Sequence, residues 1–164
     1  WCKEELAACG FEFNTRGSRC DEMLEAMIKL WTETEVTYEG KHIQLNSVKM
    51  DPKPVQTPHI PLIIGGYSKA AMERAARFGQ GWIGFGTDAE QTASALKMLD
   101  QALTQAGRSR EDIEIIVMPS NANSDNVTMY QDIGVNRLIP MLTASSQGAV
   151  KKRIDEIAKL TDAL

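Results

Sequence analysis

Short apolar segments alternate with amphipathic segments from residue 62 onward, and this rhythm limits the fold more than any other feature. The apolar segments predict strands at 62–64, 82–85, 113–118 and 137–141. The amphipathic segments predict helices at 68–78, 88–106, 126–133 and about 147–160. Short strands that alternate with helices imply a parallel sheet with the helices packed outside it.

Four strand–helix units fit two α/β architectures. An intact (β/α)8 barrel needs about 250 residues and eight units, whereas this chain has 164 residues. We therefore predict an α/β fold that is the C-terminal half of a (β/α)8 TIM barrel, with parallel strands each followed by a helix. The alternative is a small, open, doubly wound sheet. Strand order separates the two, because a barrel keeps sequential strands as neighbours and a doubly wound sheet reverses direction.

Residues 1–61 have a different character, although we expect them to form a single domain, 1–164, with the four βα units of 62–164. They predict a helix over 1–9 that ends at Gly10, and a second helix capped by Ser18. The apolar stripe of the second helix is expected to pack in the core: Met23, Leu24, Met27, Leu30 and Trp31. A hairpin over 36–45 and an extended proline-rich strap over 52–61 follow.

Composition excludes several classes of function. The net charge is −4 and Lys and Arg do not cluster, which argues against nucleic-acid binding. No apolar run is long enough for a membrane span, and no signal peptide is visible. Three cysteines without metal-ligand spacing predict free thiols in a cytoplasmic protein with no metal site. The start at Trp1, already within a helical pattern, suggests a piece of a longer protein.

The turn between the first strand and its helix is the best candidate binding site. It reads Gly65, Gly66, Tyr67, Ser68 and Lys69. The first turn of a helix has unpaired N–H groups and a positive dipole end, and two glycines let a ligand approach the backbone. The turn therefore suits a phosphate, with Ser68 as cap or donor and Lys69 as added charge. An ordinary turn with a serine cap stays the alternative, since neither GxxxxGK[ST] nor GxGxxG is present.

Other polar residues carry weaker signals. His59 lies before the first strand, where a structural role is expected, and His42 is expected to be isolated and exposed. Ser145 and Ser146 follow the last strand and either touch a ligand or cap the final helix. Polar loop residues after the third strand are expected to face solvent: Asn121, Asn123 and Ser124. No catalytic acid, base or nucleophile can be assembled from these residues.

Several segments together resemble the luciferase-like monooxygenase superfamily, particularly its deazaflavin-dependent oxidoreductase branch. The resemblance covers nearly the whole chain and rests on the order and spacing of its motifs. They are Phe13 to Glu22 with Leu30-Trp31-Thr32, Pro52 to Gln56, Pro58 to Gly66, Ala75 to Trp82, and Gly134 to Leu138.

That resemblance implies a flavin- or deazaflavin-dependent oxidoreductase or monooxygenase acting on a small organic substrate. It implies that a turn like Gly65–Ser68 approaches the phosphate of FMN or of the deazaflavin, coenzyme F-420. Trp1 would end the family's Gly-Val-Gly-x-Gly-Trp segment, and the isolated chain is expected to be inactive. An inactive half-barrel that forms a homodimer through its open edges, or a stand-alone phosphate-binding module, is the alternative.

Overall fold

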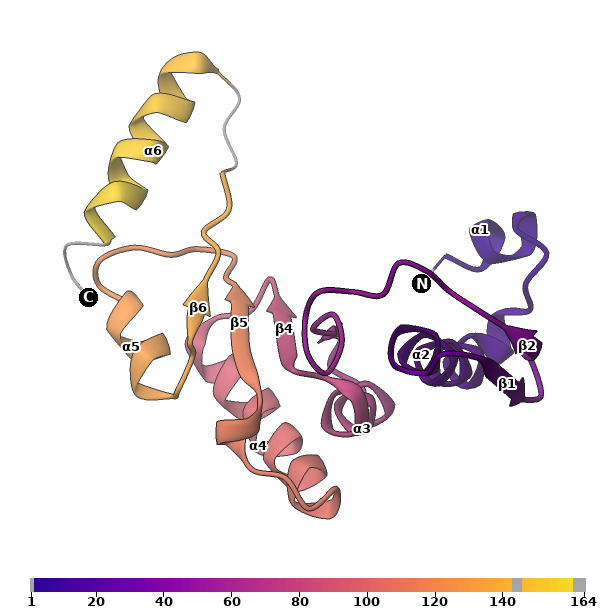
Figure 1. Cartoon of the computed structure of the whole chain (residues 1–164). Coiled ribbons are helices and arrows are strands. Elements are labelled where there is room, and N and C mark those ends of the chain that lie inside the picture. The colour runs from indigo at the N-terminus through magenta and orange to yellow at the C-terminus, as the bar shows by residue number, and fades with distance from the viewer. Residues whose placement is uncertain (1, 143–145, 161–164) are drawn as a thin grey trace. The chain divides into compact units, whose positions relative to one another are not determined.

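The computed structural model describes residues 2–142 and 146–160, and the chain divides into two compact units between Pro61 and Leu62 (Figure 1). This boundary falls where the proline-rich segment gives way to the strand–helix repeat. Each unit is described by itself. Trp1 and Ser145, both singled out from the sequence, lie outside the described residues.

The N-terminal unit contains the predicted helices and hairpin. Its elements are α1 (Lys3–Ala8), a 3-10 turn (Phe13–Thr15), α2 (Arg16–Thr32), β1 (Val36–Glu39) and β2 (Gln44–Val48). Gly10 follows α1 with φ +77°, the left-handed conformation expected of a residue that ends a helix. The strands β1 and β2 pair antiparallel, as the alternating pattern predicts.

The predicted cap of the second helix was wrong. Helix α2 begins at Arg16, because the 3-10 turn leads straight into it, so Ser18 lies within the first helical turn. The Ser18 hydroxyl donates to the Thr15 carbonyl at 3.2 Å and lies 2.8 Å from Nε2 of His42. His42 is therefore half-buried and paired, which corrects the expectation that it is isolated and exposed.

The apolar stripe of α2 is only partly buried, which also departs from the prediction. Leu24 is buried, but the side chains of Met23 and Met27 are exposed. Helical spacing places these residues on one face, yet a two-stranded hairpin is too small to cover that face. Trp31 is half-buried, with its ring centroid 5.8 Å from that of His59.

The carboxylate of Glu22 fastens the hairpin turn to α2. It accepts backbone hydrogen bonds from Lys41 at 3.0 Å, His42 at 2.6 Å and Ile43 at 3.0 Å. Desolvation raises the pKa of this carboxyl, but the three N–H donors and the nearby His42 together outweigh it. The pKa of Glu22 therefore lies below its usual value of 4.5.

This shift predicts an acid-sensitive contact. Because the folded pKa of Glu22 is depressed, its stabilisation is complete above the unfolded pKa and is lost as the pH falls through the folded pKa. We expect Glu22→Gln to lower the thermal midpoint at pH 7, with the difference from wild type shrinking below about pH 4. Circular dichroism melts across pH 3–7 measure it. The control is Glu39→Gln, an exposed position on the same hairpin, and an equal loss in both variants would contradict the prediction.

Residues 49–61 form neither helix nor strand, as the prolines predict. Lys53 anchors this segment to the end of α2. Its ammonium donates to the carbonyl of Leu30 at 2.8 Å and to that of Glu33 at 2.5 Å. These bonds satisfy carbonyls at a helix C-terminus, where a cation is favoured.

The C-terminal unit alternates strands and helices. Its strands are β3 (Ile63–Gly65), β4 (Gly81–Phe85), β5 (Glu114–Met118) and β6 (Arg137–Leu138). Its helices are α3 (Lys69–Phe78), α4 (Ala89–Gln105), α5 (Val127–Asp132) and α6 (Gln147–Leu160), with a 3-10 turn at Arg110–Asp112. Figure 1 shows β4, β5 and β6 side by side, with α4 and α5 beside them.

Strand order decides between the two predicted architectures. The sheet runs β3-β4-β5-β6, and each neighbouring pair is parallel. Sequential parallel neighbours without a reversal are the arrangement of a (β/α)8 barrel wall, so the half-barrel prediction is confirmed and the doubly wound alternative is wrong.

The last strand is shorter than predicted. The prediction placed a strand over 137–141, whereas β6 ends at Leu138. Ile139 still donates to the carbonyl of Val117 at 2.8 Å. The next residue, Pro140, has no N–H with which to continue the ladder.

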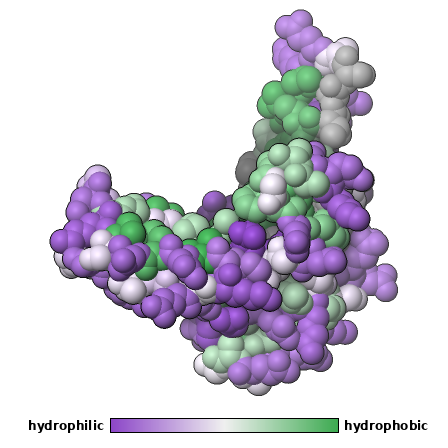
Figure 2. All heavy atoms as spheres, turned by 90° about the vertical axis from the view of Figure 1, so that its right-hand side faces the viewer, coloured by the Kyte–Doolittle hydropathy of each residue, from purple (hydrophilic) through white to green (hydrophobic). Residues whose placement is uncertain are grey.

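The core lies on one face of this sheet. Trp82, Ile115 and Val117 are fully buried there against apolar residues of α3, α4 and α5. Strand residues alternate between faces, so the opposite face carries Ile63 and Phe85, and Phe85 is 59% exposed. In a closed barrel this second face points into the interior. The surface seen in Figure 2 is mostly hydrophilic, with hydrophobic residues gathered in a few patches.

Candidate functional site

The turn after β3 joins this strand directly to α3 and contains one residue with a positive φ. Gly65 ends β3, and Gly66 follows with φ +114°, a conformation open essentially to glycine. A Cβ at Gly66 would lie 3.0 Å from the Cβ of Ala71. Glycine at position 66 thus lets the turn lie close to the first turn of α3. The turn lies at the C-terminal edge of the parallel strands, where ligands of such sheets bind.

Ser68 is the N-cap of α3, which is one of the two roles predicted for it. Its Oγ accepts from the backbone N–H of Ala71 at 3.2 Å. The N–H groups of Lys69 and Ala70, in the first turn of α3, have no partner within the helix by its geometry. A hydroxyl that accepts one bond still has a proton to donate. Two backbone donors and one hydroxyl donor are therefore available at the positive end of the α3 dipole.

Tyr67 faces the neighbouring strand. Its hydroxyl donates to the carbonyl of Phe85 at 2.9 Å, and its ring meets that of Trp82 edge to face, with centroids 5.7 Å apart. The side chain of Tyr67 therefore ties the turn to the end of β4. Its backbone N–H is the part of this residue suited to an anion.

From the sequence, Trp82 was predicted to lie in a strand and at the end of one family motif, with no link to the turn. Its Nε1 donates to the carbonyl of Gly66 at 2.9 Å, and the ring is fully buried. The strand register places Trp82 beside Ile64, two residues before Gly66. An indole N–H buried in a core needs an acceptor, and that requirement is the signal that could have linked Trp82 to the turn.

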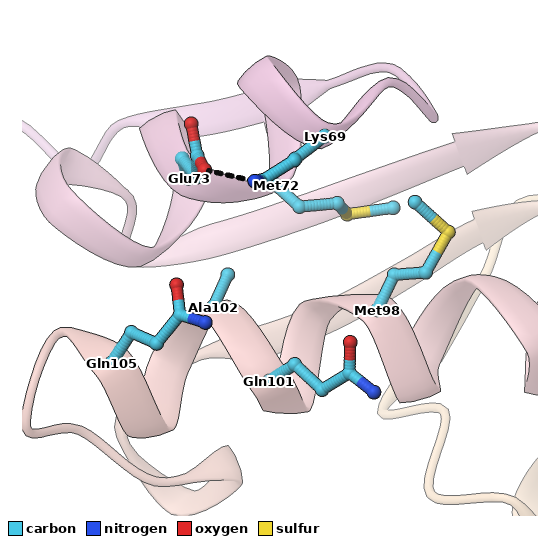
Figure 3. Close-up of a pocket in the computed structure, with 7 residues that line it drawn as sticks. All are labelled: Lys69, Met72, Glu73, Met98, Gln101, Ala102 and Gln105. Carbon is cyan, nitrogen blue, oxygen red and sulfur yellow. Dashed lines mark ion pairs between the residues drawn. The ribbon is translucent and has the colours of Figure 1, made fainter.

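The side chain of Lys69 lies along α3, toward Glu73. Its ammonium lies 3.7 Å from the carboxylate of Glu73, and its side chain is 84% exposed. Both residues border a cavity of about 140 Å³ between α3 and α4 (Figure 3). The cavity is lined by Lys69, Met72, Glu73, Met98, Gln101, Ala102 and Gln105. An exposed pair of this kind is weak, so Lys69 can swing toward an anion at small cost.

A second, more open cavity of about 360 Å³ lies beside the turn. It is lined by Tyr67 and by residues of α4: Glu90, Gln91, Ser94, Ala95 and Met98. The carboxylate of Glu90 disfavours a phosphate there. The donors at the start of α3 are the better match for an anion.

The remaining predicted residues have structural contacts. Nδ1 of His59 lies 2.8 Å from the carbonyl of Ile60, in keeping with a structural role. Asn123 is half-buried and organises its own loop, since its Oδ1 accepts from the backbone of Asp125 and Asn126. Ser146 accepts from the backbone N–H of Ala149 at 3.3 Å and so caps α6.

The described part of the chain comprises residues 2–142 and 146–160. Among these residues, no three His, Cys, Asp or Glu side chains gather where they could hold a metal ion. No helix in the same ranges has the length and apolarity to cross a membrane. The three cysteines are free thiols.

Comparison with known proteins places the chain in a family. The family model described as luciferase-like monooxygenase matches residues 1–132. The chain is 34% identical over 80 residues to an FMNH2-dependent dimethylsulfone monooxygenase from Pseudomonas putida, covering 47% of this chain and 22% of the relative. It is 33% identical over 104 residues to an F420-dependent glucose-6-phosphate dehydrogenase from Microbacterium testaceum, covering 62% and 30%.

A solved structure shares the fold. An F420-dependent secondary alcohol dehydrogenase, in complex with an F420-acetone adduct, superposes with a TM-score of 0.75 at 12% identity, covering 92% of this chain and 62% of that one. The chain spans about half the length of the curated relatives that it matches over most of its own length. With the family model matching well over half of its residues, this chain belongs to the luciferase-like monooxygenase family.

Proposed function

We propose that the turn formed by Gly65, Gly66, Tyr67 and Ser68, with Lys69, binds the phosphate of FMN or of F420. The observation that carries the proposal is the geometry of this turn: a glycine at φ +114° leads directly into the capped start of α3. Unpaired N–H groups, a hydroxyl and a helix dipole form a donor set that suits a phosphate. Membership of a family whose relatives use FMNH2 or F420 supports the same assignment.

We propose that the full-length protein catalyses the oxidation or reduction of a small organic substrate. A bound flavin or deazaflavin supplies the redox chemistry, and the protein positions it and shapes the site. In this chain the turn holds the phosphate end of the cofactor. The exposed sheet face with Ile63 and Phe85 offers apolar surface beside it. We assign no acid or base to this chain, and we expect the 164 residues alone to bind without turnover.

The test compares cofactors with and without the phosphate. Titration of the chain with FMN and with riboflavin, followed by flavin fluorescence, is expected to show tighter binding of FMN. F420 and the same deazaflavin without its phosphate form the second matched pair. Inorganic phosphate is expected to compete with FMN but not with riboflavin. Equal affinity for both members of each pair would overturn the proposed phosphate site.

A further inference from the structure

A core residue, Trp82, is hydrogen-bonded to the peptide unit between Gly66 and Tyr67. Trp82 is fully buried on the helix-covered face of β4, and its Nε1 donates to the Gly66 carbonyl at 2.9 Å. A trans peptide is planar, with its C=O and N–H pointing in opposite directions. A bond that draws the Gly66 carbonyl toward the indole therefore turns the N–H of Tyr67 away from it.

The indole is itself held in place by its neighbours. A Cβ at Gly84 would lie 2.7 Å from the Trp82 ring and 3.0 Å from the Tyr67 hydroxyl, so only glycine leaves room for both. The Tyr67 ring meets the Trp82 ring edge to face, and the Tyr67 hydroxyl is bonded to the Phe85 carbonyl. The turn is thus connected to β4 by two hydrogen bonds, one accepted by the carbonyl of the Gly66–Tyr67 peptide and one donated by the side chain of Tyr67.

Gly66 needs this support. At φ +114° it lies in a part of conformational space where several turn geometries are open to glycine. Without an anchor, the Gly66–Tyr67 peptide is free to rotate, and the direction of the Tyr67 N–H would not be defined. A fixed donor direction is what preorganises a site for its ligand.

We infer that Trp82 is a positioning residue for the phosphate turn: its indole N–H fixes the Gly66–Tyr67 peptide so that the Tyr67 N–H is aimed at the bound phosphate. This inference rests on the proposed function and deepens it. Because Trp82 is fully buried, its side chain is not itself a ligand contact. It acts on one end of the cofactor only, through the carbonyl of Gly66.

The test is Trp82→Phe, which keeps an aromatic ring in the core and removes the N–H. The affinity for FMN is expected to fall about three- to tenfold, the value of one hydrogen bond, while the affinity for riboflavin is unchanged. If the role of Trp82 were purely structural, Trp82→Phe would lower the affinities for FMN and riboflavin by the same factor. The matched control is Asn136→Ala, which removes a bond to the backbone of Ile115 in the same sheet, at its opposite edge. It is expected to lose thermal stability without changing the preference for FMN.

Two outcomes separate the inference from the function on which it rests. If wild type binds FMN and riboflavin equally, the phosphate site itself is wrong. If wild type prefers FMN and Trp82→Phe keeps the full preference, only the role of Trp82 is overturned. A second measurement covers a variant that fails to fold. In NMR spectra of the wild-type chain, the Nε1–H resonance of Trp82 is expected to shift when FMN is added and to stay unchanged when riboflavin is added. If FMN produced no shift, the inference would also be overturned.

Discussion

The Gly66→Ala chain is expected to bind FMN about ten- to a hundredfold more weakly than wild type, because a non-glycine residue held in such a conformation costs about 1–3 kcal/mol and 1.4 kcal/mol is tenfold in affinity. The added Cβ would also lie 3.0 Å from that of Ala71 in the first turn of α3. Relief of this strain shifts the Tyr67 and Ser68 donors from their positions. The affinity for riboflavin is expected to stay the same, since it has no phosphate.

The control for this variant is Gly107→Ala in the same unit. Gly107 also has a positive φ, +69°, but it lies after α4, and a Cβ there would meet no atom within 4 Å. Both variants thus place an alanine at a positive φ, and Gly107 follows the C-terminal end of α4, whereas Tyr67 of the turn lies near its N-terminal half. Fluorescence titrations of both variants with FMN and riboflavin make the comparison. Wild-type affinity for FMN in Gly66→Ala would show that the phosphate is bound elsewhere.

Leu99→Ala is expected to lower the free energy of unfolding by about 2–5 kcal/mol. Leu99 is fully buried, and it packs in the cluster that includes Trp82 and Ile115. Truncation removes apolar contacts and leaves a cavity in a core that cannot fully collapse around it. Domains are typically stable by about 5–15 kcal/mol, so a loss of this size removes much of the total. Urea unfolding followed by tryptophan fluorescence measures the change.

The neighbouring residue supplies the comparison. Met98 lies on the same helix, but its side chain is 42% exposed. We expect Met98→Ala to change the free energy of unfolding by less than about 1 kcal/mol. Similar losses for the two variants would mean that the helix-covered face of the sheet is not the core of this unit.

The order and type of the elements follow from local pattern. Strand and helix periods differ, so the alternation after residue 62 identified each unit, and the serine at 68 marked the start of α3. Errors came where tertiary packing decided the outcome. The stripe on α2 has the spacing of a core face, yet Met23 and Met27 are exposed because the hairpin covers too little of it. His42 is far from Ser18 in sequence, and only the folding of the hairpin onto α2 places the two side chains in contact.

The turn for which we propose phosphate binding shows the same division. Its glycines, its serine and its place between strand and helix can be read from consecutive residues, because turn chemistry and capping depend on neighbours in the chain. The support from Trp82 could not be read in this way. It depends on the parallel register of β3 and β4, which brings Trp82 next to residues far from it in sequence.

The sequence by itself determined the succession of strands and helices, the family resemblance and the position of the candidate turn, since each is encoded in local pattern and spacing. Only the tertiary structure decided that the strands lie in sequential parallel order and that Trp82 bonds to Gly66. It also decided which apolar faces are covered. Strand pairing and side-chain burial are set by the packing of distant segments, and periodicity states only which residues share a face.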